Sequence, residues 1–369
     1  METKKSYDPL NDDLSYILNS CKNEFNEMSG SGLLITGGAG FLGHYFIQSI
    51  LKWNELNNED KKIELYVLDN FVRGMPSWLI DLQANNDFVI INQSILDPLP
   101  DNFKNIDYII HAASIASPIF YRKNPIATMD ANVNGLRNIL DFCLSFNNKV
   151  KGILYFSTSE IYGDPSEDQI PTKETYRGNV SCTGPRACYD ESKRYGETMC
   201  VNFSQEHNLP IKIARPFNNY GPGLKITDGR ALPDFARNIV EKKDIILLSD
   251  GSPTRTFCYV SDAIIGYFKI LVIGRSGESY NIGTETPEIS ILELAKKCID
   301  IGKEVFGYEV GLNFLESSDK DYLVDNPNRR CPDISKARKE LSYKPSIGIE
   351  EGLLKSFHWY KSNHAVGEE

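Results

Sequence analysis

The 369-residue sequence has no long hydrophobic run. None of its apolar stretches approaches the roughly 18–20 residues that a membrane-spanning helix requires. Basic residues are also in deficit, with 40 Lys and Arg against 50 Asp and Glu and a formal net charge of −10. Because nucleic-acid binding needs clustered Lys and Arg, we expect no nucleic-acid partner and no membrane partner.

The eight cysteines lack the spacing of a metal or disulfide framework. None belongs to a CxxC pair, and none has a nearby histidine at the spacing of zinc ligands. The polar start, METKKSYDPL, has no apolar segment of a secretory signal. We therefore expect free thiols, no metal site and a cytoplasmic location.

What the sequence does contain is an alternation of short apolar runs with amphipathic segments. Apolar runs such as IELYVLDN and GILYFSTS are separated by helical patterns, the longest at 125–146 and 187–208. This alternation predicts an α/β fold, a Rossmann-type doubly wound parallel sheet. Loops rich in Gly, Pro and Asp follow residue 216 and predict a smaller C-terminal α/β lobe that binds the substrate.

The expected domain organisation has three parts. Residues 1–30 would form an N-terminal extension, a loosely attached helix joined through the flexible sequence SGSG. The Rossmann domain would span 31–215 and also receive about 256–285. The smaller lobe would consist of 216–255 and 286–369.

A glycine-rich segment links the first predicted strand of the sheet to a helix. In TGGAGFLG, Gly37, Gly40 and Gly43 are spaced three apart. Such a turn lets the backbone approach a pyrophosphate at a helix N-terminus. Asp69 ends the next strand, where its carboxylate can accept hydrogen bonds from ribose hydroxyls and would repel a 2′-phosphate. The combination predicts a dinucleotide site that favours NAD over NADP.

A tyrosine and a lysine stand four residues apart in a predicted helix. Tyr189 and Lys193 therefore lie on one helix face. A nearby ammonium group would lower the pKa of the phenol, which makes tyrosine a usable proton acceptor. Thr158, at the end of a strand, can donate a hydrogen bond to the same reacting oxygen.

These segments together resemble the extended short-chain dehydrogenase/reductase family of NAD-dependent nucleotide-sugar epimerases, dehydratases and decarboxylases. The resemblance runs from about Leu33 to about Pro345. It rests on TGGAGFLG, HAAS, STSEIYG, YDESK, RPFNNYGP and TRTFCYVSD.

Within this family, four segments resemble the UDP-glucuronate decarboxylases. They are ASPIFYRKNP, GPRACYDESKR, DGRALPDF and DNPNRRCPDISKA. Ser159 stands where the dTDP-glucose 4,6-dehydratases usually carry Asp, and galactose-type epimerases usually have small residues at Ser159-Glu160. The resemblance therefore implies decarboxylation of UDP-glucuronate to UDP-xylose through a 4-keto intermediate, with NAD recycled.

The resemblance also assigns site residues. Catalytic roles are implied for Thr158, Ser159, Glu160, Tyr189, Lys193 and Arg255. Contacts with NAD are implied for Gly37, Gly40, Phe41, Leu42, Gly43, Asp69, Asn70, Ile95, Ala112, Ala113, Ser114, Asn132, Tyr189 and Lys193. Contacts with a nucleotide sugar, a UDP-sugar above all, are implied for Ser117, Tyr121, Asn218, Arg230, Arg255 and Arg330. Arg215 remains open between a diphosphate ligand and an ion-paired side chain.

Two alternatives stay open at this stage. One is a 4,6-dehydratase or an epimerase that acts on another nucleotide sugar. The other is a catalytically silent protein that binds NAD or a sugar nucleotide. The family further implies a homodimer formed through the helices at 125–146 and 187–208.

Overall fold

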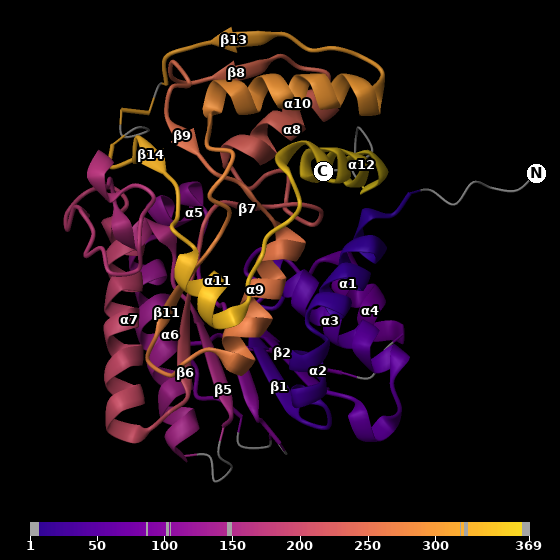
Figure 1. The fold of residues 1–369 in the computed structure, drawn as a ribbon, viewed down its shortest axis with the longest axis vertical. Helices are drawn as coiled ribbons and strands as arrows, with labels where there is room; N and C mark the ends of the chain where they lie inside the picture. The colour runs from indigo at the N-terminus through magenta and orange to yellow at the C-terminus, as the bar shows by residue number, and fades with distance from the viewer. Residues whose placement is uncertain are drawn as a thin grey trace, which may run out of the picture.

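A seven-stranded parallel sheet forms the centre of the molecule. The computed structural model describes residues 7–85, 88–100, 103, 105–145, 150–317, 319–320 and 324–363. The strands follow the order β3-β2-β1-β4-β5-β6-β11 (Figure 1). Their bounds are β1 Gly32–Thr36, β2 Glu64–Asp69, β3 Val89–Asn92, β4 Tyr108–His111, β5 Gly152–Phe156, β6 Ile211–Pro216 and β11 Ser279–Ile282. The order reverses between β1 and β4, and α/β sheets bind ligands beyond the carboxyl ends of their strands at such a point. The predicted Rossmann-type sheet is confirmed.

Helices cover both faces of the sheet. On one face, α3 (Phe41–Leu56) and α9 (Val260–Ile273) pack on the alternate side chains Leu33 and Ile35 of β1. On the other face, α6 (Pro125–Ser145) and α7 (Ala187–His207) cover Leu34 of the same strand. The strands are buried on both faces, which explains their continuous apolar sequences. Two shorter helices, α4 (Ser77–Asn85) and α5 (Pro118–Lys123), follow β2 and β4.

The smaller lobe lies beyond the carboxyl ends of the strands, at the top of Figure 1. Its helices are α8 (Ala231–Val240), α10 (Ile291–Phe306) and α12 (Ile349–Asn363), and α10 packs on both of the others. Three short sheets complete it: β7 (Asn219–Tyr220) with β10 (Cys258–Tyr259), β8 (Ile245–Leu247) with β13 (Leu312–Phe314), and β9 (Thr254–Arg255) between β12 (Ile289–Ser290) and β14 (Arg329–Arg330). Helix α11 (Ser335–Leu341) returns to pack on α9 and β11. The smaller lobe is therefore built from sequence segments that precede α9 and from segments that follow β11.

The N-terminal segment differs from its expected loose attachment. Helices α1 (Pro9–Ser20) and α2 (Lys22–Met28) pack on α9, and Ile17 and Phe25 have no exposed surface. Asp13 is also fully buried, where its carboxylate accepts hydrogen bonds from the hydroxyls of Tyr45 (3.0 Å) and Tyr259 (2.7 Å). The expectation is wrong because the apolar face of this segment completes the core around α9.

The expected flexible joint is likewise a closely packed turn into β1. A Cβ atom on Gly32 would lie 1.7 Å from the carbonyl oxygen of Asn105. Only glycine permits this approach of two backbones. Glycine therefore serves close packing here and does not give the chain freedom to move.

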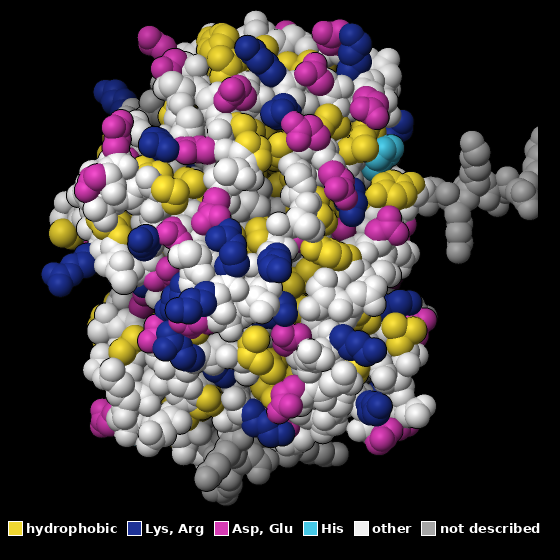
Figure 2. Space-filling view, in the orientation of Figure 1, with side chains coloured by type: hydrophobic (Ala, Val, Ile, Leu, Met, Phe, Trp, Pro, Cys, Tyr) yellow, Lys and Arg dark blue, Asp and Glu magenta, His cyan; other side chains and the backbone are white. Residues whose placement is uncertain are grey.

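Charge is distributed without a single dominant sign on the face shown in Figure 2, where acidic and basic side chains are interspersed. None of the helices in the described part of the chain has the length and apolar character needed to cross a membrane. The eight cysteines are all free. Within the described residues, no group of three or more His, Cys, Asp or Glu side chains gathers as a metal ion would require.

Candidate active site

The glycine turn lies between β1 and α3. Gly37 has a positive φ of 74°, and a Cβ atom there would lie 2.7 Å from the backbone of Ala113 after β4. Gly40 occupies the N-cap position of α3 without a capping side chain, and Phe41, Leu42 and Gly43 form the first helical residues. The unpaired N–H groups of such a helix start attract a phosphate, and the missing side chains let it approach. The turn thus fits the pyrophosphate of a dinucleotide.

Asp69 stands at the carboxyl end of β2 and braces this turn. Its Oδ2 accepts a hydrogen bond from the backbone N–H of Ala39 (3.0 Å), and its Oδ1 accepts one from Phe71 (2.9 Å). A carboxylate has about four acceptor positions, so two remain for ribose hydroxyls. The next residue, Asn70, uses its side-chain oxygen to hold the N–H of Val72 (3.1 Å).

Other predicted cofactor residues connect the glycine turn to α7. Ala112 donates its N–H to the carbonyl of Thr36 (3.1 Å). Ser114 donates to Oδ1 of Asn132 (2.7 Å), whose Nδ2 in turn donates to Ser192 Oγ on α7 (2.9 Å). Ile95 is buried against Gly135 of α6, where a Cβ atom would lie 2.7 Å from its Cγ2. The structure therefore brings the predicted residues from β1, β4 and α6 together beside the helix that carries Tyr189.

Tyr189, Lys193 and Thr158 lie buried at the centre of the site. Thr158 caps the short helix η2 (Ser159–Tyr162), and its hydroxyl also hydrogen-bonds the Tyr189 phenol. Lys193 donates from Nζ to the carbonyl oxygen of Phe156 (2.7 Å) and lies 5.9 Å from the Tyr189 ring centroid. The three residues thus form the predicted group, with the ammonium fixed by a strand end.

The electrostatics of this group differ from the expected pattern in one respect. Burial lowers the pKa of Lys193 to about 7, so its ammonium is a weak source of positive charge at neutral pH. Burial raises the pKa of Tyr189, while the hydrogen bond from Thr158 opposes that rise. The expected lowering of the tyrosine pKa is therefore wrong for the protein alone, because burial is the largest influence on this pKa and raises it, and the carboxylates of Glu160 and Asp190 add to the rise.

Tyr121 on α5 stacks on Tyr189. Their ring centroids lie 4.9 Å apart with an interplanar angle of 7°. The Tyr121 hydroxyl is buried and has no hydrogen-bond partner among the described residues. The guanidinium carbon of Arg186 lies 6.0 Å from the centre of the Tyr121 ring. An unpartnered buried hydroxyl beside the reactive tyrosine is suited to contact a polar ligand.

Glu160, one residue beyond the buried Ser159, is held by two arginines. Arg330 of β14 forms two bonds of 2.5 Å to its carboxylate, and Nη2 of Arg186 lies 2.5 Å from Oε2. Burial alone would raise the pKa of Glu160, but the two guanidinium groups outweigh it and lower this pKa to about 2. Arg330 thus binds both carboxylate oxygens of Glu160 in this structure. Its predicted contact with a nucleotide sugar remains a proposal.

Arg255 has no carboxylate partner among the described residues, although it is buried. Its guanidinium donates only to neutral oxygens, including the carbonyls of Thr254 (2.7 Å) and Pro327 (2.6 Å). Burial, followed by repulsion from Arg330, lowers its pKa to about 9. A buried cation that lacks a counter-ion is a binding position for an anion.

The remaining predicted substrate residues surround this centre. Ser117, at the start of α5, donates to the carbonyl of Asp228 (2.6 Å), and Arg230 forms an ion pair with the Asp228 carboxylate. Arg230 also acts on Tyr189, whose pKa its charge lowers. Asn218 has a positive φ of 40° and donates from Nδ2 to the carbonyl of Thr256 (2.9 Å).

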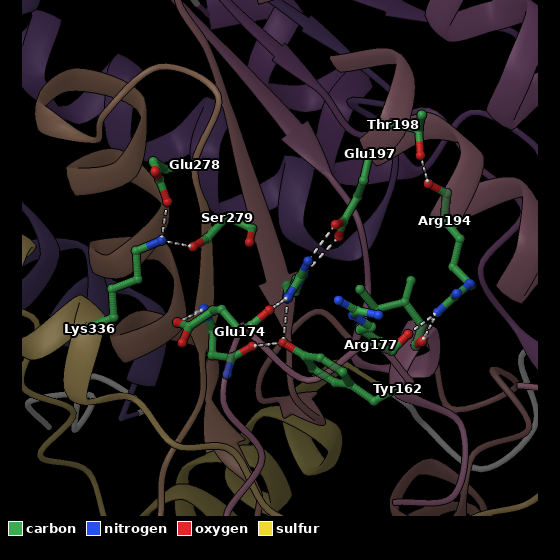
Figure 3. A network of polar contacts seen from close by, with 12 residues as sticks. Tyr162, Glu174, Arg177, Arg194, Glu197, Thr198, Glu278, Ser279 and Lys336 are labelled. Atoms are coloured by element: carbon green, nitrogen blue, oxygen red, sulfur yellow. Dashed lines mark hydrogen bonds and ion pairs between the residues drawn. The ribbon is translucent and has the colours of Figure 1, made fainter. Parts of the chain in front are cut away.

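Of the two alternatives for Arg215, the structure shows the ion-paired side chain. Its guanidinium binds both carboxylate oxygens of Glu197 on α7 (2.8 and 2.5 Å), and Nη1 donates to the hydroxyl of Tyr162 (2.7 Å) (Figure 3). Tyr162 donates in turn to Asn281 of β11 (2.7 Å). Arg215 therefore ties α7 to η2 and is not free to bind a diphosphate.

Two residues of the site were missed by the sequence analysis. Arg186 contacts Glu160, and Asp190 is buried next to Tyr189, with Oδ2 3.9 Å from Nε of Arg186. Burial, and then the charge of Glu160, raises the pKa of Asp190 to about 8. The spacing of four residues between Arg186 and Asp190 could have indicated that their side chains are neighbours. The local sequence does not indicate that Glu160 also pairs with this arginine.

Comparisons with known proteins identify the family of this chain. Residues 33–283 match the model of the NAD dependent epimerase/dehydratase family. UDP-glucuronic acid decarboxylase 6 of Arabidopsis thaliana is 36% identical over 325 residues, which cover 88% of this chain and 87% of that protein. UDP-glucuronic acid decarboxylase 1 of Xenopus tropicalis is 34% identical over 337 residues, 91% of this chain and 73% of that protein.

Solved structures show the same fold. The dTDP-glucose 4,6-dehydratase of Streptomyces venezuelae, with NAD bound, has a TM-score of 0.76 and 25% identity, covering 90% of this chain and 97% of its own. The UDP-glucuronic acid 4-epimerase of Bacillus cereus, in complex with UDP-glucuronic acid and NAD, has a TM-score of 0.71 and 27% identity, covering 90% and 99%. With a glycine turn that fits a pyrophosphate, a braced Asp69 and the buried Tyr189 group, the chain belongs to the NAD-dependent epimerase/dehydratase family, the extended short-chain dehydrogenases, and its cofactor is NAD.

Proposed function

We propose that the protein decarboxylates UDP-glucuronate to UDP-xylose and regenerates NAD in each turnover. Relatives that are UDP-glucuronic acid decarboxylases are 33–36% identical to this chain over most of its length. The observation that carries the proposal is the excess of buried positive charge beside Tyr189.

Three arginines meet one ionised carboxylate in this cluster. Arg186 and Arg330 share Glu160, while Arg255 has only neutral partners. Asp190, with a pKa near 8, is mainly protonated at neutral pH and does not balance them. A sugar carboxylate at carbon 6 would supply the missing negative charge, whereas a neutral hexose would leave the cations unpaired.

The chain's own residues then act as follows. When bound, NAD would supply the acceptor for the hydride from carbon 4 of the sugar and a positive charge that favours the ionised form of Tyr189. Tyr189 takes the proton of the 4-hydroxyl, and Thr158 donates a hydrogen bond to the same oxygen. Lys193 lies beside Tyr189 and is fixed there by its hydrogen bond to the carbonyl oxygen of Phe156. Tyr189 later returns its proton to this oxygen.

The 4-keto sugar formed in this way is a β-keto acid. The bond between carbons 5 and 6 breaks, carbon dioxide leaves, and the electron pair moves into the carbonyl as an enolate. Two roles remain, to orient the sugar carboxylate and to guide the proton that is delivered to carbon 5. We assign them to Arg255, Tyr121, Ser159 and Glu160. Return of the hydride to carbon 4 completes the pentose.

The proposed assembly is a homodimer formed through α6 and α7. These helices pack on each other, and Ile126, Met129 and Tyr195 leave large apolar surfaces exposed on them. Four helices from two copies would bury these side chains. Sedimentation at micromolar concentration tests this assembly.

The second candidate is epimerisation at carbon 4 of the same uronate. It is favoured by the structural similarity to the UDP-glucuronic acid 4-epimerase of Bacillus cereus. A 4,6-dehydratase has less support, because Ser159 lacks the carboxyl group with which such enzymes protonate a departing hydroxyl. A silent binding protein would have no use for the intact Tyr189 group.

One experiment separates these functions. The protein is incubated with NAD and, in turn, with UDP-glucuronate, UDP-glucose and dTDP-glucose, and carbon dioxide and sugar mass are followed together. Loss of carbon dioxide from UDP-glucuronate supports the proposal. An unchanged mass with a new stereoisomer indicates epimerisation, loss of water from a hexose indicates dehydration, and no conversion of any sugar indicates a binding protein.

A further inference from the structure

Arg186 lies between two carboxylates and satisfies only one of them. Its Nη2 pairs with Glu160 at 2.5 Å, while its Nε is 3.9 Å from Oδ2 of Asp190, too far for a hydrogen bond. The Nε of Arg186 is buried without a hydrogen-bond partner in the described part of the chain, and so is Oδ1 of Asp190. Unmet buried donors and acceptors are rare and costly, so two of them side by side indicate an alternative pairing.

The helix places the second pairing within reach. Arg186 occupies the N-cap position of α7 without a side-chain capping bond, and Asp190 lies one turn later. Because Nε is already 3.9 Å from Oδ2, a small rotation of the guanidinium would bring Nε onto the aspartate. Asp190 is 4% exposed, so water cannot satisfy its carboxyl group from outside. The same rotation would withdraw Nη2 from Oε2 of Glu160, which would remain attached to Arg330 alone.

We propose that Asp190 is a positioning residue that competes with Glu160 for Arg186, and that this competition sets whether Oε2 of Glu160 is held by two arginines or by Arg330 alone. This inference rests on the proposed function only for the part played by Glu160 in turnover. Among the described residues, the Asp190 side chain forms no hydrogen bond with the glycine turn or with the Tyr189 phenol, although its charge raises the pKa of Tyr189. The role proposed for it is exerted through Arg186.

The protonation of Asp190 decides the competition. The charged groups that face it are Glu160 on η2, Arg186 on its own helix, Arg330 on β14 and Asp325 in the loop before β14. Below its pKa of about 8, Asp190 is neutral and Arg186 stays on Glu160. Above that pKa an ionised Asp190 attracts Arg186, and Oε2 of Glu160 keeps only its bond to Arg330.

The first test measures pairing without any substrate. Double-mutant cycles with Arg186→Gln are run in the full chain by urea unfolding at pH 6 and pH 9.5, once with Glu160→Gln and once with Asp190→Asn. The coupling of Arg186 to Glu160 should fall between these pH values, while its coupling to Asp190 should rise. Couplings that do not change with pH overturn the proposal, even if the enzyme has another substrate.

The second test measures turnover of UDP-glucuronate. If an ionised Asp190 is needed, the ionised fraction and therefore kcat should rise about tenfold between pH 7 and pH 9 in the wild type. Asp190→Asn should remove this rise while NAD remains bound, and the neighbouring, half-exposed Glu191→Gln should retain it. The same rise in Asp190→Asn would overturn the positioning role. Absence of turnover in every variant would overturn the proposed function and leave the unfolding test to decide the pairing.

Discussion

Arg330 and Glu160 join the smaller lobe to the end of β5 through two parallel bonds of 2.5 Å. Arg330 belongs to β14, and Glu160 belongs to the turn that follows Thr158. Residues 170 positions apart in sequence thereby fix the two halves of the site to each other. The ionised state of Glu160 depends on this pair together with Arg186, because burial raises the pKa of Glu160 and the two guanidinium groups lower it.

Replacing the guanidinium group of Arg330, which donates two parallel hydrogen bonds, by a lysine ammonium group tests this relationship. Arg330→Lys keeps the positive charge but cannot bind both oxygens at once. We expect kcat with UDP-glucuronate to fall about tenfold, as one charge-assisted hydrogen bond is lost. Arg329→Lys is the matched control, since Arg329 binds Glu288 outside this cluster. Equal effects of the two substitutions would show that the pair has no special role.

Tyr189 is the proposed proton acceptor. Tyr189→Phe removes the phenol oxygen but keeps the ring that stacks on Tyr121. We expect turnover to fall by about 10²–10⁴-fold, the usual contribution of a general base. Bound NAD, measured by absorbance after denaturation, should not change. Tyr7→Phe is the control, because this tyrosine is 47% exposed and its ring contacts His358 outside the site; it should have near-normal activity. Near-normal turnover in Tyr189→Phe would refute the assignment.

Glu197 and Arg215 form a buried ion pair between α7 and β6. Glu197→Gln leaves the guanidinium buried without a counter-charge, so the free energy of unfolding should fall by about 3–5 kcal/mol. Glu350→Gln breaks an exposed ion pair with Lys297 and should cost at most about 1 kcal/mol. Urea unfolding measures both variants. A small loss in Glu197→Gln would mean that Arg215 finds another partner or water.

Lys193 should give the stability of the protein a distinctive pH dependence. Its pKa is lowered to about 7 in the folded protein, while an unfolded lysine titrates near 10.4. Between these values the unfolded chain binds more protons, so stability rises with pH. The free energy of unfolding of the wild type relative to Lys193→Met should therefore increase from pH 7 to pH 10. The exposed Lys243→Met should show no such change, and a constant difference for Lys193→Met would contradict the lowered pKa.

The sheet followed from local patterns, and local patterns also picked out the residues that we propose for the cofactor site. The glycine turn and Asp69 each stand at a strand end, and the parallel sheet brings such ends together. The Tyr189–Lys193 pair followed from helical spacing. What local pattern could not supply was the identity of distant partners: Glu160 with Arg330, or Arg215 with Glu197.

The N-terminal helices show a second limit. Leu14, Ile17 and Leu18 of α1 have the spacing of an amphipathic helix, but a sequence pattern does not say what covers an apolar face. Here α9 covers it, more than 200 residues later. The pKa of Tyr189 shows a third limit, because desolvation depends on burial from every side of the site.

The central claim is the loss of the sugar carboxyl group. The purified protein with NAD is given UDP-glucuronate labelled with ¹³C at carbon 6, and labelled carbon dioxide and the UDP-sugar are measured together. The account predicts labelled carbon dioxide and an unlabelled UDP-pentose in equal amounts, without net accumulation of NADH. Retention of the label in a UDP-hexuronate, whether unchanged or epimerised, would contradict it.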